Sequence, residues 1–341
     1  MARWIAIAWI VLKVGLTISL AANAQDEPGR WQALENDPSC EVWNAYPQPQ
    51  EEATWTGACE NGRADGEGVL TWRYVVDGEP RESSYTGNLR NGQLDGFGVY
   101  VHANGRRYEG EFWNGQPNGS GILSSVDGDR YQAAFLHGLP HGRGTLYWIN
   151  GDRYQGEFLN GHRHGHGDMH FANGDRYVGD FADSEVHGQG VAYWANGDRY
   201  EGDFVNGQTH GQGTFYWARG DRYEGDFLYN EATGQGTHYH ANGDRYEGDV
   251  VNGLAHGHGT IYWTNGDRYE GEWLDDLRSG QGTVIYANGD RFEGQFVDDL
   301  PNGFGRYWHQ DGYVEGHWRD GCLSGRDGDF AVETDNANCG F

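Results

Sequence analysis

The residues with the clearest capacity for chemistry are the histidines of GHRHGHGDMH, residues 161–170. His162, His164 and His166 alternate along the chain, and alternate side chains of an extended strand share one face. Imidazoles gathered on one face are suitable ligands for zinc or copper. The spacing therefore predicts a metal site at these three histidines. The alternative is that the histidines belong to a repeated structural pattern.

Aromatic pairs of the form Tyr-Trp are a second candidate. In a strand, the two adjacent rings point to opposite faces, so one ring of each pair should pack in the core. We expect the other ring to contribute to an exposed stripe that could bind a glycan or a peptide. The candidate ligand-binding residues are Trp148, Trp194, Trp217 and Trp263.

Catalytic patterns are not found in the sequence. It has no nucleophile elbow, phosphate-binding loop or dinucleotide-binding turn, and its carboxylates recur periodically instead of forming one distinct pair. The Asp-Arg dipeptides, such as Asp198-Arg199, could form a calcium-binding ladder, but cross-strand ion pairs and turn formation explain them better. We expect a protein without enzymatic activity and without a cofactor.

The strands and turns that must position these residues recur along the sequence with a fixed period. The aromatic residue of the phrase YEG recurs every 23 residues, at Tyr85, Tyr108, Tyr131, Tyr154, Tyr177, Tyr200, Tyr223, Tyr246, Tyr269 and Phe292. Within one unit, the alternation in Arg199–Phe204 predicts a half-buried strand, and Thr214–Trp217 predicts a second strand. We expect Asn-Gly turns between units, such as Asn196-Gly197, and a glycine-rich turn or bulged return over Asn206–Gly213.

This pattern predicts an all-β fold, an elongated antiparallel β-hairpin solenoid of about twelve 23-residue repeats. Two strands per repeat, about 4.8 Å apart, would give a rod on the order of 100 Å long. The aromatic residues would form its core. His164 also recurs by this period, with His141, His187, His210 and His256, so a structural role for a loop histidine bonded to the backbone is favoured for it.

The phrase YxGxxxxGxxHGxG on a 23-residue step resembles the MORN repeat, the membrane occupation and recognition nexus. The resemblance extends from Trp55 to about Gly325. It implies a non-catalytic solenoid that serves as a scaffold, a dimerisation rod or a contact surface for peptide and lipid. Departures include Ala133 at the first glycine position, and Asn230, Asp276 and Asp299 at the second.

Charge narrows the range of partners. The chain carries a formal net charge of −27, and Lys13 is its single lysine. Nucleic acid is therefore excluded as a partner, and anionic membrane lipid is disfavoured because basic loops are missing. We expect a protein partner or self-association, with a glycan as an alternative ligand.

The two ends differ from the repeats. Residues 1–24 have a basic start, an apolar run and small residues at Ala22 and Ala24, which predicts a cleaved signal peptide. We expect a secreted or periplasmic protein, and the alternative is a chain anchored by an uncleaved N-terminal segment. The predicted organisation continues with an N-terminal cap segment at 25–54, the repeat region at 55–325 and a C-terminal cap segment at 326–341.

The four cysteines lie near the two ends of the chain, at Cys40, Cys59, Cys322 and Cys339. In an exported protein, this arrangement favours one disulfide bond at each end, although other pairings are compatible with the sequence. The leading expectation for function is an exported repeat scaffold for protein interaction or assembly. The alternative is a module that binds a glycan, a peptide or a metal ion through its aromatic and acidic face.

Overall fold

The computed structural model describes residues 29–325, 328–334 and 339. The chain divides into two compact units, an N-terminal unit that ends at Val186 and a C-terminal unit that begins at His187. The predicted signal peptide, residues 1–24, lies outside the described residues. Within the described part of the chain, no helix has the length and apolar character needed to cross a membrane.

The N-terminal unit consists of antiparallel strands joined by turns. Its strands are β1 (Arg30–Ala33), β2 (Glu41–Asn44), β3 (Glu52–Trp55), β4 (Ala58–Glu60), β5 (Arg63–Val76), β6 (Glu79–Arg90), β7 (Gln93–Val101), β8 (Arg107–Trp113), β9 (Gln116–Ser124), β10 (Arg130–Leu136), β11 (Leu139–Tyr147), β12 (Arg153–Leu159), β13 (His162–His170) and β14 (Arg176–Ala182). Strand β15 (Glu185–Tyr193) contains the boundary between the units.

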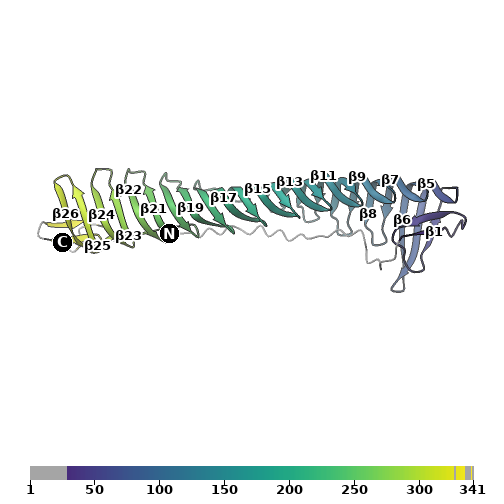
Figure 1. Cartoon of the computed structure of the whole chain (residues 1–341), viewed down its shortest axis with the longest axis horizontal. Coiled ribbons are helices and arrows are strands. Elements are labelled where there is room, and N and C mark those ends of the chain that lie inside the picture. Colours follow the sequence, from purple (N-terminus) through teal and green to yellow (C-terminus); the bar gives the residue numbers. More distant parts are fainter. Residues whose placement is uncertain (1–28, 326–327, 335–338, 340–341) are drawn as a thin grey trace. The chain divides into compact units, whose positions relative to one another are not determined.

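The C-terminal unit repeats the same plan. Its strands are β16 (Arg199–Val205), β17 (Gln208–Tyr216), β18 (Arg222–Leu228), β19 (Glu231–Tyr239), β20 (Arg245–Val251), β21 (Leu254–Tyr262), β22 (Arg268–Leu274), β23 (Leu277–Ile285), β24 (Arg291–Val297), β25 (Leu300–His309), β26 (Gly312–Trp318), β27 (Cys322–Gly325) and β28 (Gly328–Ala331). Consecutive strands within each unit lie side by side (Figure 1). The prediction of an all-β fold built from antiparallel hairpin repeats is confirmed.

The second strand of each repeat is longer than the sequence suggested. Strand β17 begins at Gln208, so most of the segment expected as a turn over Asn206–Gly213 is strand. The turn is reduced to Asn206 and Gly207, with φ of 50° and 76°, which is the left-handed geometry of a tight two-residue hairpin. The surplus residues of β17 form a bulge, seen as a register shift between Gly202 and Asp203 of the paired strand.

The other Asn-Gly sequence makes a different turn. Trp194 donates its N–H to the carbonyl of Asp198 at 3.0 Å, and Gly197 donates to Trp194 at 2.9 Å. In this turn only Gly197 has a positive φ, of 93°. The tight hairpin therefore uses Asn206-Gly207, which was expected to lie inside a longer loop, and not Asn196-Gly197.

We call the face that carries the repeat aromatics the inner face and the opposite face the outer face. Tyr200 and Phe204 are fully buried on the inner face, and their rings meet edge to face at 5.1 Å. The Tyr200 hydroxyl donates to the carbonyl of Asp203 at 3.1 Å, which lays the ring flat over the next strand. A Cβ on Gly213 would lie 2.3 Å from that hydroxyl oxygen, so the repeat requires glycine beneath its tyrosine.

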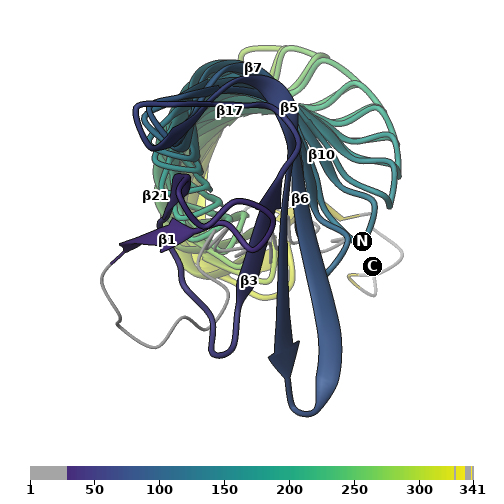
Figure 2. The same cartoon turned by 90° about the vertical axis from the view of Figure 1, so that its right-hand side faces the viewer.

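The ends of the chain carry the elements outside the repeat. In the N-terminal unit, the long hairpin of β5 and β6 projects beyond its neighbours (Figure 2). A disulfide bond joins Cys40 to Cys59 in this unit. In the C-terminal unit, a second joins Cys322 to Cys339. These are the end-local pairs that the sequence favoured.

Candidate interaction surface

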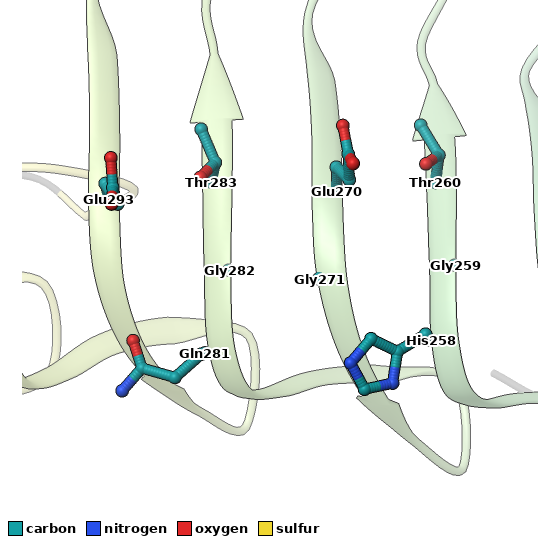
Figure 3. A pocket seen from close by; sticks show the side chains of 9 residues that line it. All are labelled: His258, Gly259, Thr260, Glu270, Gly271, Gln281, Gly282, Thr283 and Glu293. Carbon is teal, nitrogen blue, oxygen red and sulfur yellow. The ribbon is translucent and has the colours of Figure 1, made fainter.

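The outer face of the C-terminal unit carries a regular row of glutamates and threonines. Glu224 lies opposite Thr214 on one side and Thr237 on the other, and the same alternation continues across neighbouring strands. Figure 3 shows the continuation of this row, with Glu293, Thr283, Glu270 and Thr260 on four adjacent strands. The glutamates stand two strands apart, which corresponds to about 9.6 Å.

A second row on the outer face alternates arginine with aromatic residues. Tyr239 lies between Arg222 and Arg245, and the Arg222 guanidinium carbon lies 4.1 Å from the centre of the Tyr239 ring. Arg245 lies 4.5 Å from the ring of Tyr262 in the same way. Such cation–π stacking holds each arginine flat against its neighbour on the next strand.

Most ion pairs on the outer face of the C-terminal unit run along a strand. Arg245 contacts Glu247 at 3.0 Å, and both belong to β20. Arg268 contacts Glu270 of β22 at 2.7 Å. The expectation of cross-strand ion pairs is confirmed at Arg176 with Asp168 and at Arg306 with Glu315. Most arginines of the C-terminal unit instead pair along their own strand and stack on an aromatic ring of a neighbouring strand.

A third row brings amides and carboxylates together. Gln212 of β17 donates its side-chain N–H to Asp226, and Gln235 of β19 donates to Asp249. One open hollow beside this row has a volume of about 460 Å³ and is lined by His258, Gln281 and the glutamate–threonine row (Figure 3). The face is thus polar and periodic.

The aspartates of the Asp-Arg dipeptides are structural. Asp198 accepts the N–H of Ala218 from the following repeat at 2.8 Å, and its other oxygen accepts the side-chain N–H of Asn196 at 2.8 Å. The bond to the following repeat recurs at Asp129, Asp152, Asp221, Asp244 and Asp267. These carboxylates clamp one turn to the next, which explains the repeat of aspartate without a calcium ladder.

The histidines of β13 do not converge. The Nδ1 of His162 lies 3.5 Å from the Ser184 hydroxyl, whereas the Nδ1 of His166 lies 3.3 Å from a carboxylate oxygen of Asp180. His164 is paired with Glu157 on the opposite strand. Among the described residues, His162, His164 and His166 are not among the groups whose ligand atoms all lie within 4.8 Å of one another.

The repeat histidines also differ from expectation. His141, His164 and His210 lie in strands, not loops, and the Nδ1 atom of each is buried without a hydrogen-bond partner. The expectation that hydrogen bonds to the backbone hold these histidine rings is therefore wrong for their Nδ1 atoms. Packing against the neighbouring strands holds them instead.

The tryptophans of the Tyr-Trp pairs lie on the inner side. Trp194 and Trp217 contact the buried ring of Phe215 at centroid distances of 5.4 Å and 4.7 Å. Trp148 and Trp263 each lie beneath a buried arginine, at 5.5 Å and 5.7 Å. All four rings are half-buried, so the exposed aromatic row of the outer face is made by their tyrosine neighbours.

The arginines above Trp148 and Trp263 were not singled out from the sequence. Arg163 and Arg278 are buried, and each donates to the carbonyl of a residue in the next tight turn, Ser184 and Asp299 respectively. That turn lacks glycine at its second position in both cases. The sequence signal that could have found them is an arginine at a position where sister repeats carry Pro140, Val186 or Ala232.

One group of metal-ligand type was not predicted as a site. Asp221, His238 and His240 each offer a ligand atom, and the three atoms lie within 4.8 Å of one another. Asp37, Cys40 and Cys59 also lie close together, but the two cysteines are joined in a disulfide bond. The sequence signal for the first group was a pair of histidines two residues apart, at positions where sister repeats carry apolar or aromatic residues.

Comparison with known proteins agrees with this architecture. The MORN repeat model matches eleven segments that together cover more than half of the chain, residues 60–73, 85–106, 108–130, 131–153, 154–176, 177–199, 200–222, 223–245, 246–268, 269–291 and 292–312. No curated protein matches the chain. The repeated tyrosine over glycine, the tight turns and the matched segments show together that this chain belongs to the MORN repeat family.

Proposed function

We propose that this protein is a non-enzymatic, exported scaffold that binds a protein partner or a second copy of itself through the outer face of its repeats. MORN repeats are modules of protein or membrane interaction. The observation that carries the proposal is the outer face itself, where rows of side chains repeat at a constant spacing. A periodic polar face of this kind suits an extended partner better than a small substrate.

Charge indicates the chemistry of that partner. Three consecutive repeats present a glutamate and an aspartate on the outer face against one arginine, as in Glu224 and Asp226 against Arg222. The chain as a whole has a formal net charge of −27. We therefore infer a partner with basic side chains, whose association would be accelerated at low ionic strength and weakened by salt.

Export is supported by two features. The two disulfide bonds suit an oxidising compartment, and the first 24 residues have the composition of a signal peptide. A membrane role through anionic lipid is disfavoured, because the acidic outer face would repel such a surface.

The arrangement of the outer aromatics favours protein over glycan. Sugar rings stack on free aromatic faces, whereas Tyr239 and Tyr262 are covered by guanidinium groups at 4.1 Å and 4.5 Å. Binding of the purified protein to a glycan array tests the glycan alternative directly. Strong glycan binding without a protein partner would replace this proposal with the alternative of a ligand-binding module.

The test is to reverse the charge of the glutamate row. The variant carries Glu224→Lys, Glu247→Lys and Glu270→Lys, and the control carries Glu60→Lys, Glu79→Lys and Glu82→Lys, which changes the net charge equally outside that row. Partner capture from the exporting cell's extracellular fraction and light scattering of the purified protein are the measurements. We expect the row variant alone to lose its partner or its self-association. Equal behaviour of the two variants would refute the outer-face proposal.

A further inference from the structure

The group of Asp221, His238 and His240 arises from departures from the repeat that meet at one place. His238 occupies an inner-face position that holds Phe215 and Ile261 in the neighbouring repeats. It lies opposite two core tyrosines of the adjacent strands. An ionisable ring has therefore replaced an apolar core residue, at a site where an apolar side chain would pack more favourably.

His240 is the second departure. It stands where Trp217 and Trp263 stand in the sister repeats, two residues beyond His238. The two imidazole rings stack with their centres 4.2 Å apart and an interplanar angle of 30°. The ring of Trp217 lies 5.4 Å from that of His238 and forms one wall of the group.

The carboxylate comes from the preceding turn. Asp221 is buried, and one of its oxygens accepts the N–H of Ala241 at 2.7 Å. Its other oxygen accepts from Arg219, which is the third departure, because sister turns carry asparagine there, as in Asn196 and Asn242. A carboxylate oxygen has two lone pairs, so this second oxygen keeps acceptor capacity beyond its bond with Arg219.

The His238 ring has an unmet bonding capacity. Its Nε2 is buried and has no hydrogen-bond partner. The unprotonated nitrogen of a neutral imidazole carries a lone pair that can bind a metal. A buried polar atom without a partner is costly unless a ligand satisfies it.

We propose that Asp221, His238 and His240 form a binding site for one divalent transition-metal ion, with Zn²⁺ and Cu²⁺ as the ions that this set of ligands suits. Two imidazole nitrogens and one carboxylate oxygen are a common ligand set for such ions, and a fourth position is left for water. In tetrahedral zinc sites the ligand atoms stand about 3.3 Å apart, so small rotations of the two rings complete the geometry. Asp244 and Asp276 lie within electrostatic reach of His240 and add negative charge around the site.

Zinc titration of the purified protein after treatment with a chelator tests the proposal. The variants His238→Phe and His240→Trp restore the residues of the sister repeats, so they preserve the packing of the hairpin. The control is His162→Gln with His166→Gln, which restores the sister residues Gln208 and Gln212 in the same manner. Calorimetric titration with Zn²⁺ alone, and then with Cu²⁺, gives the stoichiometry and affinity.

We expect one zinc ion per chain with a dissociation constant on the order of micromolar or below. Each site variant should weaken binding at least about tenfold, and the control should bind as the wild type does. Zinc should also raise the melting temperature of the wild type and of the control, but not that of His238→Phe. Equal affinity in wild type and site variants, loss of binding in the control alone, or no binding by a folded wild type would overturn the proposal.

Discussion

Strands β13 and β19 both contain histidines, but these histidines lie on opposite faces of the sheet. The four histidines of β13 alternate on the outer face, where His162 and His166 contact different neighbours. His238 of β19 lies on the inner face and meets His240 and Asp221. Among the described residues, ligand-type atoms of histidine and aspartate come together where histidines depart from the repeat, and not where histidines are most numerous.

Geometry explains the difference. Side chains two residues apart on a flat strand have Cα atoms about 6.7 Å apart, and nothing on the outer face of β13 brings their tips together. His240 instead opens the turn that follows β19, and Asp221 belongs to the turn before β18. The hydrogen bond from Ala241 to Asp221 clamps these two turns together, so their side chains share one small volume.

The largest expected effect contrasts the two faces of β13. Met169 is buried on the inner face, and its replacement in Met169→Ala should lower the free energy of unfolding by about 2–5 kcal/mol, because a cavity forms beneath the core rings. The outer-face change His166→Ala should alter it by less than about 0.5 kcal/mol. Urea unfolding followed by tryptophan fluorescence measures both. Similar losses in the two variants would contradict the assignment of the faces.

The second prediction concerns pH. The pKa of His238 is about 4 in the folded chain and about 6.5 in the unfolded chain. Between pH 6.5 and 4, the His238 ring is therefore protonated in the unfolded state and neutral in the folded state. The free energy of unfolding of the metal-free wild type should therefore fall by about 3 kcal/mol, relative to His238→Phe, as pH decreases from 6.5 to 4. Urea unfolding in a chelating buffer measures it. A constant difference between the two proteins across this range would show that His238 is not buried as a neutral ring.

A smaller effect is expected from Arg219. Its positive charge lies beside the carboxylate of Asp221, so Arg219→Asn, which restores the sister residue, should strengthen zinc binding by about fivefold. Removal of an equal charge from an exposed residue of β11, in Arg143→Gln, should leave zinc affinity unchanged. Calorimetric titration of both variants distinguishes a local electrostatic effect from a change in net charge.

The smallest expected effect lies in the outer-face ion pairs. Glu247→Gln removes the partner of Arg245, whose guanidinium still stacks on Tyr262. Because both charges are partly exposed to water, the free energy of unfolding should change by less than about 0.5 kcal/mol. A loss as large as that of Met169→Ala would mean that the outer face carries the stability of the repeat.

The sequence was sufficient to predict the repeat, its strands and its aromatic core. Tyr200 and Gly213 recur on a fixed step, and a ring that must lie flat over a backbone leaves room only for glycine. The length of β17 was underestimated, because the glycines of His210-Gly211-Gln212-Gly213 were interpreted as a turn when they form a bulged strand. Glycine marks both arrangements, and strand pairing decides between them.

The candidate site was less predictable. The tryptophans Trp148, Trp194, Trp217 and Trp263 were correctly grouped by their period, but the face on which each ring lies depends on where the strand ends and the turn begins. Arg163 resembled an exposed residue by its type, yet the structure buries it against three aromatic rings. Such burial depends on contacts between repeats, which the sequence of one repeat does not contain.

By itself, the sequence determined the period, the strand faces and the family of this protein, because a 23-residue step with tyrosine and glycine in fixed places permits few other ways of burying an aromatic core. Only the tertiary structure decided which histidines meet. His162, His164 and His166 are close in sequence and lie on one strand, but their ring nitrogens do not come together. Asp221 and His238 lie seventeen residues apart in sequence, and their ligand atoms meet because adjacent hairpins stack in register.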